Sequence, residues 1–436
     1  MGSRTGSVTE LAAPLVLPCG STLPNRLAKG AMTEGLATAD GVPTPELERL
    51  YRLWAEGGAG MLLTGNVQID RDHLERPGNV VIDAIPSAAK RAALERWAKA
   101  GTANGTQLWM QISHAGRQTP SQVNKTPKAP SAVKLGLPGG QFGQPVALSE
   151  EEILDLINRF AIAASIAQET GFSGVQIHAA HGYLISAFLN PLANIRSDLW
   201  GGSLENRSRF LLETVAAVRA KVGPNFPVSV KLNSADFQRG GFAFEDSMVV
   251  AKWLEAAGVD LLEISGGSYE QPAMMDSEGL TPAERPNVAA STAKREAYFV
   301  DFAKAMKAQV SLPLMVTGGF RTRAAMTHAL ENGAADVIGL GRPMCADPDL
   351  PRALLDGSRD AERWEDKLHL LPTWLGWLKS IKMVRAIDGF AVQYWYYGQL
   401  YTLGRTGKAN LTLSVLAAWR EVEATHKALI AARGNG

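Results

Sequence analysis

The sequence has few cysteines, no excess of positive or negative charge, and no long apolar run. Its 436 residues include two cysteines, Cys19 and Cys345, too few for a disulfide framework or an iron–sulfur cluster and too far apart for a Cys-x-x-Cys pair. The formal net charge of +1 gives no electrostatic reason to expect nucleic acid or an acidic membrane surface as a partner. Neither an apolar run of about 18 residues nor a signal-peptide core is present. We therefore expect a cytoplasmic protein without a membrane span, with both cysteines reduced.

Short apolar segments alternate with longer segments of helical periodicity. The apolar segments lack strict alternation, which is typical of strands buried on both faces of a parallel sheet. Eight of them are predicted strands: 26–32, 59–65, 106–112, 173–178, 226–233, 259–265, 312–319 and 335–341. Helices are predicted at 149–171, 203–223, 245–258 and 295–309, and Ser149 with Glu152 forms a capping box at the start of the first. This repeat favours an α/β fold of the (β/α)8 TIM-barrel type over a doubly wound open sheet.

Three stretches depart from the alternation. Residues 114–148 and 266–292 are long connections without recognisable elements that follow strands, so we expect functional loops at the mouth of the barrel. Beyond about residue 355 the chain is rich in tryptophan and tyrosine, which are enriched at interfaces. We therefore expect a barrel over residues 1–355 and a helical extension over 356–436, packed on the barrel or on a neighbouring subunit of a homo-oligomer.

Two loops at the expected mouth have the composition of a phosphate site. Gly318 and Gly319 follow the seventh strand, and Gly341 and Arg342 follow the eighth. Glycine lets backbone N–H groups approach an anion, and arginine adds a charge-assisted hydrogen bond. In barrels of this kind the loops after strands seven and eight often bind phosphate. Other polar or glycine positions at strand ends are Thr33, Gly65, Gln111 and Lys231.

The stretch HAAHGY, residues 178–183, directly follows the fourth strand. His178 and His181 are two ligands without a third nearby, so no metal site is predicted. They fit either hydrogen-bonded core histidines or a donor pair aimed at a substrate oxygen, with Tyr183 as a nearby acid. Lys231 fits a Schiff-base nucleophile, a positive charge beside an electron-rich cofactor, or one half of an ion pair. Spacing alone leaves these alternatives open.

A longer run around this stretch resembles one family. The segment GVQIHAAHGYLISAFLNPLANIRSDLWGGSLENRSRF, residues 174–210, is similar to the Old Yellow Enzyme family of FMN-dependent ene-reductases. Supporting matches are NRLAKGAMTE (25–34), RPGNVVID (76–83), QISHAGR (111–117), VTGGF (316–320) and GLGRPMCADPDL (339–350). The resemblance covers roughly residues 10–355. The cysteine clusters of members with an extra flavin or iron–sulfur domain are missing, which indicates a reductase that contains FMN alone.

The resemblance implies bound FMN, with NADPH or NADH as co-substrate. The residues that would contact FMN are Ala31, Met32, Thr33, Gly65, Gln111, Lys231, Gly318, Gly319, Gly341 and Arg342. Among them Thr33 would reach the C4 carbonyl oxygen, Lys231 would lie beside N1 and O2, and the last four would hold the phosphate. Many relatives have arginine in place of Lys231; lysine keeps the charge but loses the planar fork.

The resemblance also implies the reaction. His178 and His181 would bind the carbonyl oxygen of an α,β-unsaturated substrate, and Tyr183 would protonate its α-carbon. The expected function is NAD(P)H-dependent reduction of small activated alkenes such as enones, enals and maleimides, in two half-reactions. The alternatives are a flavin oxidoreductase that acts on quinones, nitro compounds or oxygen, a lyase with Lys231 as Schiff-base nucleophile, and a flavin-binding protein without turnover.

Overall fold

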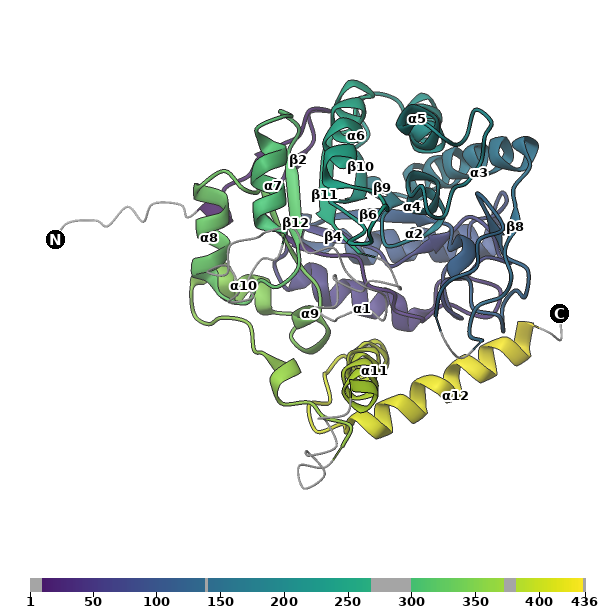
Figure 1. Ribbon diagram of the computed structural model, residues 1–436. Helices are drawn as coiled ribbons and strands as arrows, with labels where there is room; N and C mark the ends of the chain where they lie inside the picture. The colour runs from purple at the N-terminus through teal and green to yellow at the C-terminus, as the bar shows by residue number, and fades with distance from the viewer. Residues whose placement is uncertain (1–9, 138–139, 268–298, 372–381, 434–436) are drawn as a thin grey trace.

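The computed structural model describes residues 10–137, 140–267, 299–371 and 382–433 (Figure 1). Its centre is a nine-stranded sheet. Eight of the strands form a closed parallel barrel, because β13 pairs with β3 and β4 pairs with β6. The ninth strand, β5 (Val67–Gln68), pairs with β6 outside this ring. The barrel strands are β3 (Leu27–Lys29), β4 (Met61–Leu63), β6 (Gln107–Ser113), β9 (Gly174–Ala179), β10 (Val228–Asn233), β11 (Leu261–Ser265), β12 (Leu314–Thr317) and β13 (Val337–Leu340). Every predicted strand is present, so the (β/α)8 prediction is confirmed and the open sheet is excluded.

Helices surround the barrel, as Figure 1 shows. They are α1 (Pro45–Glu56), α2 (Ala88–Gly101), α3 (Glu150–Glu169), α4 (Leu184–Leu189), α5 (Leu204–Val222), α6 (Phe244–Ala256), α7 (Val300–Lys307), α8 (Arg323–Glu331), α9 (Pro343–Ala346) and α10 (Leu350–Asp356). The predicted capping box of α3 is present, because Ser149 Oγ accepts from the Glu152 N–H and Glu152 Oε2 accepts from the Ser149 N–H. The helix predicted over 295–309 is described only from residue 299 onward, and α7 is that part.

The N-terminal end of the barrel is closed by apolar side chains. A hairpin of β1 (Leu15–Val16) and β2 (Thr22–Leu23) lies at this end. Leu17, between its strands, joins an inner apolar cluster that includes Trp109 of β6. Because this end is filled with apolar groups, the polar side chains inside the barrel gather at the opposite, C-terminal end, where the βα loops lie.

The long βα loop at 114–148 is more ordered than its composition predicts. It contains η3 (Gly116–Gln118) and two short strands, β7 (Lys128–Ala129) and β8 (Val146–Ala147), which pair in parallel. The expectation of a connection without its own elements is therefore wrong for this loop, because backbone groups of its two ends satisfy one another. The second long connection, predicted at 266–292, lies outside the described residues from position 268 onward.

The end of the chain forms two helices, α11 (Lys382–Thr406) and α12 (Val415–Arg433), which lie together along one side of the barrel in Figure 1. Arg49 of α1 donates through Nη1 to the carbonyl oxygens of Gly404 and Arg405 near the end of α11, at 2.5 and 3.0 Å. Smaller elements are β5 (Val67–Gln68), η1 (Glu10–Ala12), η2 (Ala103–Gly105) and η6 (Trp364–Asp366). In the part of the chain that is described, no helix is long and apolar enough to cross a membrane.

Candidate active site

His178, His181 and Tyr183 lie together at the C-terminal end of β9. The ring centroids of His178 and Tyr183 are 4.8 Å apart with an edge-to-face arrangement, and those of His178 and His181 are 5.1 Å apart. The chain turns back after the strand because His181 and Gly182 both have positive φ, 64° and 80°. Tyr183 then stands at the N-cap position of α4. This turn brings three side chains from one short stretch to one point, which satisfies the geometric condition for a donor pair with an adjacent acid.

Both histidines are neutral at physiological pH. Burial, followed by the charge of Lys231, holds the pKa of His178 and of His181 well below the usual value. His178 Nδ1 accepts from the Ala180 N–H at 3.2 Å, so the ring hydrogen of the neutral imidazole is on Nε2. His181 Nε2 lies 2.7 Å from Ser265 Oγ, and when it accepts from that hydroxyl its hydrogen is on Nδ1. In that arrangement each histidine keeps one N–H for another partner.

A chain of buried polar side chains crosses the barrel below the histidines. Gln111 of β6 donates through Nε2 to Gln176 Oε1 at 2.6 Å, and Gln176 of β9 donates through Nε2 to Glu263 Oε2 at 2.9 Å. Glu263 of β11 pairs through Oε1 with Lys231 Nζ of β10, also at 2.9 Å. The strand register sets Lys231 opposite both Glu263 and His178. Lys231 is therefore one half of an ion pair, and an ammonium group held by a carboxylate has no free lone pair for a Schiff-base attack.

The segment after β3 and the end of β4 are in close contact. A Cβ atom on Gly65 would lie 2.3 Å from Glu34 Oε2 and 2.5 Å from the Met32 carbonyl oxygen, so only glycine lets the two loops approach so closely. The hydroxyl of Thr33 donates to Glu75 Oε2 at 2.7 Å. Its single hydrogen is then committed to Glu75, and the hydroxyl must leave that carboxylate before it can donate to another oxygen. Ala31 is partly buried against the inner apolar cluster.

The loops after β12 and β13 contain three glycines and an arginine that has no partner among the described side chains. Gly318 and Gly319 have positive φ, 130° and 78°. A Cβ atom on Gly341 would meet no atom of the described residues within 4 Å, so they leave the space in front of this backbone open. Among the described residues, Arg342 makes no hydrogen bond or ion pair through its side chain, whereas the neighbouring Arg321 is paired with Glu365. Open glycine backbone beside an unpaired guanidinium fits a phosphate group.

Sequence reasoning missed three acidic residues of this region, of which Glu34 and Glu263 are buried. Glu263 and Glu75 are the partners of Lys231 and Thr33, and Glu34 lies against Gly65. The only local signal was Glu263, a charged residue inside the apolar strand segment VDLLEIS (259–265), where burying an unpaired carboxylate would be costly. Such a residue has to find a partner, but the sequence does not say which one.

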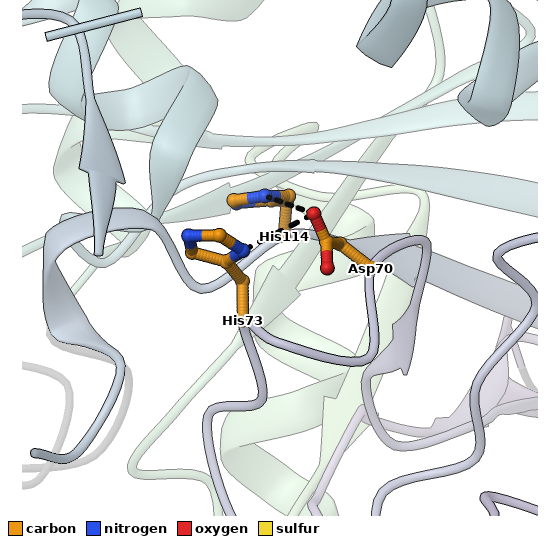
Figure 2. A group of neighbouring side chains, drawn as sticks. All are labelled: Asp70, His73 and His114. Atoms are coloured by element: carbon orange, nitrogen blue, oxygen red, sulfur yellow. Dashed lines mark ion pairs between the residues drawn. The ribbon is translucent and has the colours of Figure 1, made fainter. Parts of the chain in front are cut away.

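A second cluster of titratable groups is formed by Asp70 and His73, which follow β5, and His114, which follows β6 (Figure 2). Asp70 Oδ2 lies 3.1 Å from His73 Nδ1 and 3.8 Å from His114 Nε2, and the two imidazoles are stacked. These three donor atoms lie within 4.8 Å of one another, which is the spacing of a candidate metal site. However, the outer nitrogens accept backbone hydrogens, His73 Nε2 from Lys128 N–H and His114 Nδ1 from Gly116 N–H.

Those backbone donors determine which nitrogen of each imidazole carries the hydrogen. An imidazole that accepts at its outer nitrogen carries its hydrogen on the inner one, where it faces the Asp70 carboxylate. Metal-bound histidines have the opposite arrangement, because they donate their outer N–H to an acceptor. Burial also lowers the pKa of His114 to about 4, so that its neutral form is kept. The cluster is therefore better described as two imidazole N–H groups that face Asp70 than as a metal centre.

Comparison with known proteins agrees with this geometry. The profile of the NADH:flavin oxidoreductase / NADH oxidase family matches residues 10–360. The chain is 39% identical to the NADH-dependent flavin oxidoreductase iliE of Hypocrea jecorina over 78% of this chain and 88% of that protein. It is 36% identical to the NADH-dependent flavin oxidoreductase iccE of Talaromyces variabilis over 92% of this chain and 99% of that protein. The old yellow enzyme homologue from Zymomonas mobilis superposes with a TM-score of 0.67 at 28% identity, over 81% of this chain and 94% of that one.

Proposed function

Because this chain belongs to the NADH:flavin oxidoreductase / NADH oxidase family, the Old Yellow Enzyme group of FMN-containing, NAD(P)H-dependent oxidoreductases, we propose that it is an ene-reductase. Its substrates are small alkenes activated by a carbonyl group: enones, enals and maleimides. The observation that carries this proposal is the convergence of His178, His181 and Tyr183 at the mouth of the barrel, with ring centroids of His178 and Tyr183 4.8 Å apart.

The chain offers groups that suit each part of FMN. Open backbone at Gly341, the positive φ of Gly318 and Gly319, and the Arg342 guanidinium, which has no partner among the described residues, suit the phosphate. Gln111 and Lys231 lie inside the barrel, where they suit the polar edge of the flavin ring, and Ala31, Met32, Thr33 and Gly65 belong to the closely packed segments that follow β3 and β4. FMN held by these residues would supply the hydride chemistry between NAD(P)H and an acceptor.

The histidine pair binds and polarises the substrate. His178 Nε2–H is left for a ligand by the local hydrogen bonds, and so is His181 Nδ1–H when His181 Nε2 accepts from the Ser265 hydroxyl. Two neutral donors on one carbonyl oxygen stabilise the negative charge that grows there when the β-carbon receives a hydride. Their depressed pKa values keep them neutral, so they do this by hydrogen bonding without adding a full charge to the buried site.

Tyr183 supplies the proton. It lies on the same turn as the histidines and is buried, so its hydroxyl is close to a substrate held by them. A phenol donates a proton to the α-carbon more readily than water in a water-poor site, because it is held in place when the carbanion character develops. Ser265 and Asn233 fix the turn: Ser265 contacts His181 Nε2, and Asn233 Oδ1 accepts from the His181 N–H at 3.1 Å.

The test is an absorbance experiment on the purified protein. The bound flavin gives a band near ~450 nm, which anaerobic NADPH should bleach and 2-cyclohexenone should restore as the flavin returns to its oxidised form. The product is then cyclohexanone, identified by gas chromatography. A band that bleaches and returns only with quinones, nitro compounds or oxygen would reject the alkene substrate and leave a flavin oxidoreductase with another acceptor.

A further inference from the structure

We propose that Arg76 is a positioning residue through which the C-terminal helices α11 and α12 hold the Thr33 side of the FMN site. The inference rests on the proposed placement of FMN but not on the identity of the alkene. Helices α11 and α12 follow the part of the chain that the family profile matches, which ends at residue 360. A role for them in the cofactor site is therefore a property of this chain beyond the common barrel.

Arg76 joins the two parts of the molecule. It is 5% exposed, which is unusual for an arginine, so the partners of its donors matter for stability; Nη2 has none among the described residues. Its Nε donates to His426 Nε2 of α12 at 2.8 Å, and its guanidinium carbon lies 3.5 Å from the ring centroid of Tyr397 on α11. Its Nη1 donates in the other direction, to the Thr33 carbonyl oxygen at 3.3 Å. One planar group thus contacts both C-terminal helices and the loop after β3.

The contacts on the C-terminal side match the chemistry of a guanidinium. Burial and the charge of Arg76 lower the pKa of His426 to about 3, so His426 stays neutral and its Nε2 lone pair accepts the arginine hydrogen. The face of Tyr397 carries the negative potential of an aromatic ring and attracts the flat cation above it. Lysine could not make both contacts at once, because it has no planar fork.

The contacts on the barrel side reach the loop that Thr33 belongs to. A Cβ atom on Gly35 would lie 3.3 Å from Tyr401 Oη and 3.4 Å from Arg76 Nε, so the loop, the arginine and α11 touch at this point. The loop is also bound to the next one, because the Ala37 N–H donates to the Gly78 carbonyl oxygen at 2.9 Å. Arg76 itself is fixed by its backbone N–H, which donates to Asn79 Oδ1 at 2.9 Å.

The consequence is a dependence of FMN binding on two residues far from each other in sequence. If Arg76 loses its contact with His426 or Tyr397, its guanidinium is buried with unpaired donors and moves, and the Thr33 carbonyl loses its partner. Thr33 and Glu75 then shift together, because the Thr33 hydroxyl donates to Glu75. A displacement of this loop removes contacts from the flavin ring while the phosphate loops stay unchanged.

The experiment is FMN titration of the apoprotein, followed by quenching of flavin fluorescence. Arg76→Met and His426→Leu should raise the dissociation constant of FMN about tenfold or more and alter the visible spectrum of the bound flavin. His426→Gln, which keeps a neutral acceptor, should bind FMN within about twofold of the wild type. His328→Leu, a substitution of the same type at an exposed position of α8, is the matched control and should leave the constant unchanged.

The results distinguish a role of Arg76 and His426 in positioning the FMN site from a role in packing alone. The thermal midpoint of each apoprotein is measured as well, because packing alone would lower this midpoint in His426→Leu while the dissociation constant of FMN stays at the wild-type value. That result, or equal losses of affinity in His426→Leu and His426→Gln, would overturn the proposal. If Arg76→Met does not fold, the two His426 variants still give the answer. No alkene is present in these titrations, so a failure of the ene-reductase proposal leaves their outcome unaffected.

Discussion

Lys231 Nζ lies 2.9 Å from Glu263 Oε1 inside the barrel, and both side chains are almost completely buried. The pair carries no net charge, although the resemblance suggests Lys231 as a positive group beside the flavin. Glu263 is held in turn by Gln176, whose Nε2 donates to its other oxygen. The carboxylate therefore reduces the positive potential that the cofactor site experiences, and it fixes where the ammonium group points.

The first prediction concerns Glu263→Gln. Removing the carboxylate leaves the Lys231 charge uncompensated, which favours the reduced, anionic flavin, so the midpoint potential should rise. A preference of about 1.4 kcal/mol for the reduced state corresponds to about 30 mV in a two-electron couple. The same variant breaks a buried ion pair, which typically costs about 3–5 kcal/mol of unfolding free energy. Spectroelectrochemical and urea titrations measure the two effects.

The control for that variant is Glu245→Gln, at an exposed position of α6. It makes the same change of charge far from the barrel interior, and neither the potential nor the unfolding free energy should change appreciably, because exposed charges are well screened. A lower potential in Glu263→Gln would contradict the assigned role of the pair.

The second prediction concerns Tyr183→Phe. The ring and its edge contact with His178 are kept, but the proton donor is lost. The rate of flavin reoxidation by 2-cyclohexenone should fall about 10²–10⁴-fold, the usual contribution of a positioned acid, while flavin reduction by NADPH should change little. Anaerobic stopped-flow absorbance separates the two half-reactions. Equal losses in both would argue that Tyr183 serves only to shape the pocket.

The third prediction concerns Gly341→Ala. No atom of the described part of the chain lies within 4 Å of the added Cβ, and the backbone is not in the left-handed region, so the unfolding free energy of the apoprotein should stay within about 0.5 kcal/mol of the wild type. A phosphate in front of this backbone would meet the new methyl group. FMN affinity should therefore fall, and isothermal titration measures it. Undiminished affinity would show that the phosphate binds elsewhere.

The fourth prediction concerns pH. The pKa of His114 is about 4, that of His426 is about 3, and those of His178 and His181 are well below the usual value, in each case mainly because of burial. Below about pH 6.5 the unfolded chain therefore binds protons that the native protein does not bind, and the unfolding free energy falls with falling pH. Urea titrations at pH 7, 6 and 5 measure this slope.

His426→Gln provides the internal check of that slope. It removes one of the groups with a depressed pKa, so its unfolding free energy should depend less steeply on pH, by up to one proton between about pH 6.5 and 3. A variant with the same slope as the wild type would mean that His426 does not take part in this linkage.

The barrel and most of the proposed site could be read from the sequence, because both depend on local patterns. Alternating apolar and helical segments predicted the eight strands and four of the helices, and the capping box at Ser149 was predicted to the residue. Once a barrel is predicted, the ends of its strands must meet at one mouth, which brings His178, Gln111 and Lys231 together without any further information.

The partners of these residues were decided only by the tertiary structure. Glu263 is one of many carboxylates in the sequence, and only the register of β10 and β11 sets it opposite Lys231. Arg76 and His426 are 350 positions apart, and no local pattern connects them. Periodicity determines which face of an element is buried, but the pairing of buried polar groups depends on how distant segments pack. The sequence alone therefore determined the scaffold and the position of the site, and tertiary packing decided the charges and contacts that tune it.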